Sequence, residues 1–125
     1  MTKCLVEEEQ QWENLRYFLQ WVVPVAEEAD VKMTMHTDDP PLSSIRGVAR
    51  IMSSIDNYQR IADLVPSPAN GIGLCQGNFS LMTDELPAAI RQFGEQKKIC
   101  FVHLRDVRGT PRSSPKHFTM TVKPI

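Results

Sequence analysis

The chain has 125 residues, of which 42% are hydrophobic and 23% charged, a composition typical of one globular domain. Its 14 Lys and Arg residues and 15 Asp and Glu residues give a formal net charge of -1, so no surplus of positive charge is available to neutralise phosphates. The longest apolar run, at residues 21–26, is far shorter than the roughly 20 residues that cross a bilayer. We therefore expect no nucleic-acid or membrane partner, and the glutamate-rich start does not resemble a signal peptide.

The three cysteines, Cys4, Cys75 and Cys100, are an odd number and include no C-x-x-C pair. A disulfide framework is therefore not expected, and this cysteine usage indicates a reducing cytoplasm. A free cysteine is most often a small buried apolar residue, which we expect of Cys100. Cys75 differs because it stands at the end of a predicted strand.

Apolar residues at helical spacing predict a long helix over residues 7–29. Pro24 is expected to kink or divide this helix, because proline removes a backbone donor. The predicted apolar stripe consists of Leu15, Phe18, Leu19, Val22, Val23 and Ala26. A short strand is predicted over residues 31–36, and two consecutive prolines then predict an irregular loop over residues 37–47.

A second helix is expected to begin at an N-cap, either Ser54 or Asp56, and to end before Pro66. It leads to a strand over residues 72–75, and the chain is expected to leave this strand at Gly77.

A third helix is predicted over residues 84–96, with Gly94 at its end, and a third strand over residues 98–104. Apolar strands that alternate with helices indicate βαβ units, so we predict an α/β fold with a parallel sheet.

Each predicted strand ends in a residue that can bind a metal: His36, Cys75 and His103. The carboxyl ends of parallel strands share one edge, so these three side chains are expected to converge. Imidazole and thiolate are both good ligands for divalent transition metals. The alternative is structural, since a single His is more often hydrogen-bonded within the fold and a single Cys more often packed.

Four charged residues beside these positions have two interpretations each. Asp38 and Asp39 could hydrogen-bond to His36 and so orient it for metal binding, or they could bond backbone amides of the loop. Arg105 and Asp106 could contact an anionic substrate, or they could form an ion pair with each other. Gly71, Gly73 and Gly77 lack the spacing of a phosphate-binding loop, so no cofactor-binding residue is predicted.

Three segments together resemble the mannonate dehydratase family, over about residues 10–111. They are V-V-P-V-A-E-E-A leading to H-T-D-D-P-P, S-P-A-N-G leading to L-C-Q-G, and F-V-H-L-R-D-V-R-G-T. Thr37 departs from the family, which carries proline there.

The resemblance implies a metal-dependent lyase that dehydrates D-mannonate to 2-keto-3-deoxy-D-gluconate in hexuronate (glucuronate) catabolism. It implies a xylose-isomerase-like (β/α)8 TIM barrel, which takes about 250 residues, so residues 1–111 would form a partial barrel of about three consecutive β/α units. His36, Cys75 and His103 match three metal ligands of the family, for Mn2+ or Fe2+. The catalytic acid and base remain unknown, and an oligomer of the full-length enzyme remains open.

Residues 112–125 are expected to be a non-homologous tail without regular structure. One back-translation of residues 115–125, read in a shifted frame, gives E-T-F-H-D-D-G-K-T-D, which is close to the family's continuation. We therefore predict a frameshift near Pro111. A short isoform with a disordered tail is the alternative.

Two functions follow. The chain is part of a mannonate dehydratase that acts on a small sugar acid, or it is a catalytically incompetent fragment that at most binds a divalent metal or a partner chain. Three strands cannot close a barrel, so we expect the chain alone to be inactive.

Overall fold

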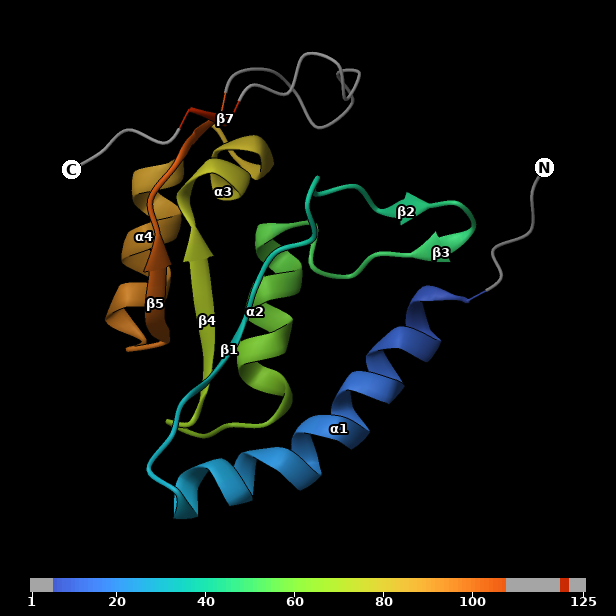
Figure 1. Ribbon diagram of the computed structural model, residues 1–125, viewed down its shortest axis with the longest axis vertical. Helices are drawn as coiled ribbons and strands as arrows, with labels where there is room; N and C mark the ends of the chain where they lie inside the picture. Colours follow the sequence, from blue (N-terminus) through green and yellow to red (C-terminus); the bar gives the residue numbers. More distant parts are fainter. Residues whose placement is uncertain (1–5, 108–119, 122–125) are drawn as a thin grey trace.

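The computed structural model describes residues 6–107 and 120–121, and its elements follow the predicted alternation of helix and strand (Figure 1). The helices are α1 (Glu8–Glu28), α2 (Ile55–Leu64), α3 (Gln76–Met82) and α4 (Leu86–Glu95). The strands are β1 (Met33–Met35), β2 (Ser44–Ile45), β3 (Val48–Ala49), β4 (Asn70–Cys75), β5 (Ile99–His103), β6 (Asp106–Val107) and β7 (Met120–Thr121).

The main sheet has three strands in the order β1-β4-β5, and both of its strand pairs are parallel. The strands are joined through helices, as the alternation of apolar segments predicts. Figure 1 shows the carboxyl ends of all three strands at one edge of the sheet, with α1 passing below the opposite edge. The predicted α/β class and parallel sheet are confirmed.

The central strand, β4, is buried along its whole length because helices cover one of its faces and its neighbours flank both edges. Alternate β4 residues, Ile72 and Leu74, point into a core formed with the helices. This core is organised around three aromatic rings, with ring centroids 5.1 Å apart for Tyr58 and Phe79 and 6.2 Å apart for Phe79 and Phe93. Cys75 follows Leu74 directly and therefore faces the other side of the sheet.

Helix α1 differs from its prediction in two respects. It is one helix of 21 residues that continues through Pro24, so proline does not divide it. Its buried face includes Trp12, which the predicted stripe omitted, whereas Phe18 is 48% exposed. The other residues of that stripe lie on the buried side, where Leu19 and Val23 form a second apolar cluster with Ala69.

Helix α2 begins as predicted at Ser54, whose hydroxyl accepts a hydrogen bond from the Asn57 amide at 3.2 Å. Ser54 rather than Asp56 is the N-cap, since an N-cap side chain must reach an amide of the first turn. Helix α4 ends differently from its prediction. Gly94 lies within the last turn, and the residue with positive φ (55°) is Lys97.

Two short elements occur where none was predicted. Strands β2 and β3 pair antiparallel as a hairpin within the predicted loop and the residues just after it. Helix α3 begins directly after Cys75, where the sequence predicted only that the chain would leave the strand at Gly77. Both are too short for hydrophobic periodicity to identify, since a two-residue strand has no repeat and a helix of 7 residues spans only about two turns.

Among residues 6–107 and 120–121, none of the helices combines the length and the apolar character that a membrane crossing requires. Most of the predicted tail, residues 112–125, lies outside the described residues. Within it, Met120 and Thr121 form β7, which pairs antiparallel with β6.

Candidate metal centre

The three predicted ligands lie at equivalent places in the fold. Cys75 and His103 are the last residues of β4 and β5 and are register partners. His36 follows β1 directly. Because Met35 packs against the core on the helix side, the next residue, His36, points to the opposite face of the sheet, as Cys75 does.

A change of register brings His103 onto the same face. Ile72 pairs with Ile99, but the next residue, Gly73, pairs with Phe101, so β5 carries one extra residue, Cys100. An extra residue of this kind is a β-bulge, and it reverses which side chains face which side beyond it. Ile99 packs against the core, whereas His103 lies beside Cys75 on the other face.

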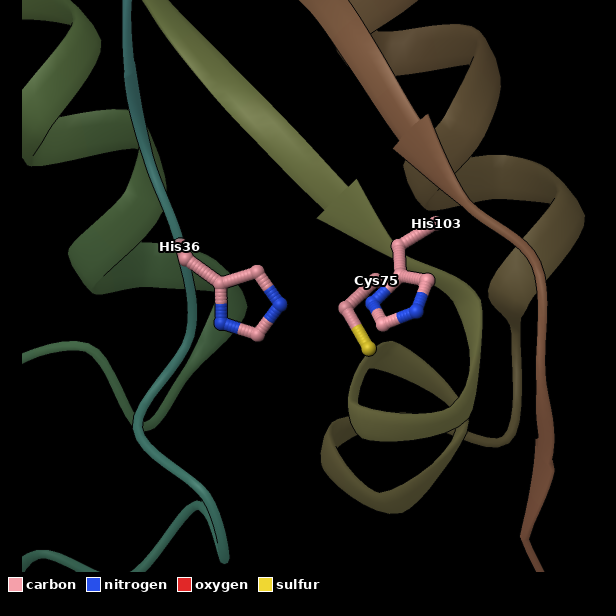
Figure 2. A group of neighbouring side chains, drawn as sticks. All are labelled: His36, Cys75 and His103. Atoms are coloured by element: carbon pink, nitrogen blue, oxygen red, sulfur yellow. The ribbon is translucent and has the colours of Figure 1, made fainter. Parts of the chain in front are cut away.

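The sequence prediction that these side chains converge is confirmed. The potential ligand atoms of His36, Cys75 and His103 all lie within 4.8 Å of one another. Figure 2 shows both imidazoles and the thiol directed toward a common space at the carboxyl ends of the strands. The two imidazole centroids are 6.0 Å apart.

The orientation of His36 suits metal binding through its outer nitrogen. Its Nδ1 lies 2.9 Å from the carbonyl oxygen of Thr37, so Nδ1 carries the proton and donates it to that oxygen. Nε2 is then the unprotonated nitrogen with a lone pair for a metal. A hydrogen bond on the second nitrogen is the usual way in which proteins fix a metal-binding imidazole.

Buried polar contacts hold the segment that carries His36. Thr37 is buried, and its hydroxyl accepts a hydrogen bond of 2.6 Å from Asn78 Nδ2, at the start of α3. Residue 37 therefore uses its hydroxyl group, which a proline at this position would lack. Asn78 was missed at the sequence level, although its place three residues after Cys75 put it near the strand ends.

Cys75 is fully buried, and its sulfur accepts a hydrogen bond from Arg105 Nε at 3.1 Å. The Arg105 guanidinium also forms an ion pair with Asp39, with 2.7 Å between Nη2 and Oδ2. Burial alone would lower the pKa of Arg105, but the hydrogen bonds and negative charges of Asp39 and Cys75 outweigh it and raise this pKa. The guanidinium therefore remains charged.

The two aspartates after His36 do not contact His36 in any interaction that the structure describes. Asp38 accepts a hydrogen bond from the Met52 amide at 3.0 Å and pairs with Arg50 at 3.0 Å. Asp39 pairs with Arg105. Of the two interpretations, Asp38 thus has the loop-bonding role. Arg105 has an ion-pair partner in Asp39 that the sequence did not predict.

The donor set fits a divalent transition metal. Two imidazole nitrogens and one thiolate match sites that hold such metals with one position left for substrate. Four-coordinate ligand atoms lie about 3.5 Å apart around such an ion, so small side-chain rotations within the observed 4.8 Å would complete the geometry. Among the described residues, this is the one cluster of His, Cys, Asp and Glu side chains with such spacing.

A family model, relatives in sequence and a solved structure all indicate the same family. A family model described as D-mannonate dehydratase (UxuA) matches residues 3–124. Mannonate dehydratase of Endomicrobium trichonymphae is 42% identical over 104 residues, and that of Thermotoga neapolitana is 44% identical over 110 residues. These alignments cover 82% and 87% of this chain, but 28% and 30% of the relatives.

The crystal structure of mannonate dehydratase from Streptococcus suis serotype 2 superposes with a TM-score of 0.77 at 36% identity, over 82% of this chain and 30% of that chain. The chain thus spans about 30% of the length of the relatives that it matches. Because the family match covers nearly all of its residues, this chain belongs to the D-mannonate dehydratase family.

Proposed function

We propose that this chain provides three ligands, His36, Cys75 and His103, of the divalent metal centre of a D-mannonate dehydratase. The observation that carries the proposal is the approach of their ligand atoms to within 4.8 Å at the carboxyl ends of three parallel strands. This edge is where (β/α)8 enzymes bind substrate, and we propose that the three β/α units belong to such a barrel. The metal is Mn2+ or Fe2+, and the substrate is the small sugar acid D-mannonate.

Dehydration of a sugar acid requires removal of the proton beside the carboxylate and departure of a neighbouring hydroxyl as water. A bound divalent cation would act as a Lewis acid that orients the substrate and offsets negative charge beside the carboxylate. The residues of this chain would fix that ion's place: His36 through Nε2, with Nδ1 tied to the backbone, and Cys75 through a sulfur held by Arg105.

The 125-residue chain is expected to bind metal without catalysing the dehydration. Among the described residues, the cluster provides three side chains, which would hold the ion and not transfer protons. Both groups are needed for the proton and the leaving hydroxyl. Metal binding without turnover is therefore the property that we propose for this chain alone.

Two measurements on the purified chain test the proposal. Calorimetric titration with Mn2+ should give one binding site per chain, and Cys75→Ser should weaken it at least tenfold. The control is Cys100→Ser, because Cys100 lies outside the cluster. Equal Mn2+ affinity in all three proteins would contradict the metal centre. Formation of 2-keto-3-deoxy-D-gluconate from D-mannonate by the chain with Mn2+ would contradict the proposed lack of turnover.

A frameshift remains our proposal for residues 112–125, although the family match extends to residue 124. Sequencing the gene on both sides of the codon for Pro111 tests it. A shifted frame that encodes F-H-D-D-G downstream is the expected result. A frame that runs intact through residue 125, with no family-like sequence in the other frames, would contradict it.

The free cysteines support a proposal for the cellular setting. Cys75 and Cys100 are both free thiols in the described part of the chain. A metal-binding thiol must stay reduced, so we propose a reducing cytoplasm as the compartment.

A further inference from the structure

Arg105 contacts two separate parts of the metal centre. Its Nε lies 3.1 Å from the Cys75 sulfur at the end of β4, and its Nη2 lies 2.7 Å from Asp39, in the loop after β1. The residue itself follows β5, so one side chain connects the ends of all three strands. Its side chain is 3% exposed, which makes it the most deeply buried arginine side chain among the ion pairs described.

The positive charge of this side chain has a negative partner in Asp39. A buried guanidinium beside a metal site would repel a divalent cation, but the Asp39 carboxylate offsets its charge at 2.7 Å. The donor that faces Cys75 can therefore hold a negative sulfur without adding net positive charge to the site. A hydrogen bond from a charged donor is also about twice as strong as one between neutral groups.

The fold reserves space for this arrangement at Gly77, in the first turn of α3. A Cβ on Gly77 would lie 3.0 Å from Arg105 Cγ and 3.2 Å from its Nε, closer than side chains normally pack. The absence of a side chain there lets the guanidinium pass close to the first turn of α3 and reach the sulfur. The burial of Arg105 thus depends on Gly77, the glycine of the segment L-C-Q-G.

We propose that Arg105 is a positioning residue of the metal centre, which holds the Cys75 thiolate in its metal-binding orientation while Asp39 fixes the guanidinium. The inference rests on the proposed function, because it requires Cys75 to bind the metal. Two guanidinium nitrogens already bind Cys75 and Asp39, and the side chain is buried. Arg105 therefore acts on the ligand rather than on a substrate arriving from solvent.

Co2+ provides a readout that is independent of enzyme activity, because a cobalt-bound thiolate gives a sulfur-to-metal charge-transfer absorption. A hydrogen bond from Arg105 stabilises the sulfur lone pairs, so its loss lowers the energy of this transition. In the full chain, Arg105→Gln should move the band to longer wavelength and weaken Co2+ binding about 10- to 100-fold. Arg105→Lys retains a charged donor and should return the band toward its original position.

Arg60→Gln is the matched control, because it also removes an arginine from an ion pair, here with Glu9 on the surface. Its band and Co2+ affinity should equal those of the unsubstituted chain. Asp39→Asn is a second test variant, in case Arg105→Gln loses the circular dichroism of the folded chain. It should shift the band in the same direction as Arg105→Gln, because the guanidinium loses its fixed position.

The outcomes separate the inference from the proposed function. No charge-transfer band in the unsubstituted chain would overturn both, since Cys75 would then not bind the metal. If the unsubstituted chain shows the band and folded Arg105→Gln shows it at the same energy, the role of Arg105 alone would be overturned. If Arg105→Gln does not fold, an unchanged band energy in Asp39→Asn would have the same meaning. A purely structural role for Arg105 predicts this second outcome, with altered stability and an unchanged band.

Discussion

The Cys100 sulfur occupies the space that a side chain on Gly71 would need. A Cβ on Gly71 would overlap this sulfur and lie 3.0 Å from the Lys98 carbonyl oxygen. Cys100 is the extra residue of β5, and the change of register at this point turns His103 onto the face of Cys75. The absence of a side chain at Gly71 therefore leaves room for the extra residue whose backbone turns His103, although Gly71 and Cys100 both lie outside the cluster of His36, Cys75 and His103.

Gly71→Ala is therefore expected to disturb both stability and metal binding. The added methyl group must displace Cys100 within a packed strand pair, which should cost about 1–3 kcal/mol of unfolding free energy. Since the same displacement moves His103, Mn2+ affinity should fall as well. Urea unfolding and calorimetric titration of the same protein measure the two effects.

Gly73→Ala is the control for this substitution, because its nearest atom would be the Met35 carbonyl oxygen at 3.5 Å, an ordinary contact. It should change the unfolding free energy far less than Gly71→Ala. Adding Cys100→Ala to Gly71→Ala should recover part of the loss, because the sulfur is removed. Equal effects of the two glycine substitutions would show that the bulge does not depend on this contact.

Gly77→Ala should destabilise the chain and displace Arg105. The new Cβ would lie 2.6 Å from Val107 Cγ2 and 3.0 Å from Arg105 Cγ, so we expect a loss of about 1–3 kcal/mol in urea unfolding. Gly94→Ala is the contrasting change, because nothing lies within 4 Å of its Cβ position in α4. Alanine is the better helix former, so this second variant should gain about 0.5–1 kcal/mol. A Gly77→Ala chain as stable as the unsubstituted one would argue against a tightly filled site.

The three-ring cluster of Tyr58, Phe79 and Phe93 should dominate the stability of the core. Phe93→Ala removes a fully buried ring and is expected to cost about 3–5 kcal/mol, or to prevent folding. Phe101→Ala removes a ring that is 55% exposed and should cost far less. Comparing their unfolding midpoints with the unsubstituted chain tests this, and similar losses for both would mean that the core lies elsewhere.

Tyr58 should make stability depend on pH in the alkaline range. Burial, with the negative charges of Asp38 and Cys75, raises the pKa of Tyr58 above its usual value. The folded state then keeps the phenol proton at a pH where the unfolded chain releases it. Stability is therefore fully present below the unfolded pKa of about 10 and decreases as pH rises above it, by up to about 1.4 kcal/mol per pH unit.

Tyr58→Phe tests this dependence, because it removes the titrating group and keeps the ring. The Tyr58 hydroxyl is buried without a hydrogen-bond partner among the described residues, so its loss should cost little at pH 7. Between pH 10 and 11, the variant should lose less stability than the unsubstituted chain. Parallel declines in the two proteins would assign the alkaline sensitivity to other groups.

The sequence could predict the sheet and the convergence of His36, Cys75 and His103 because both depend on local patterns. Apolar strands alternating with helices indicate a parallel sheet, and residues that end such strands must share an edge. The orientation of His103 could not be predicted, because it depends on a one-residue bulge that leaves no repeat in the sequence. The partners of Asp38, Asp39 and Arg105 could not be predicted either, since each contact joins segments distant along the chain.

X-ray absorption of the chain loaded with one equivalent of Zn2+ would identify the ligands of the metal itself. The three strand ends predict a coordination shell with one sulfur at about 2.3 Å and imidazole nitrogens at about 2.0–2.1 Å, and the sulfur should disappear in Cys75→Ser. A shell of oxygen and nitrogen only, or one whose sulfur persists in Cys75→Ser, would contradict a centre formed by His36, Cys75 and His103.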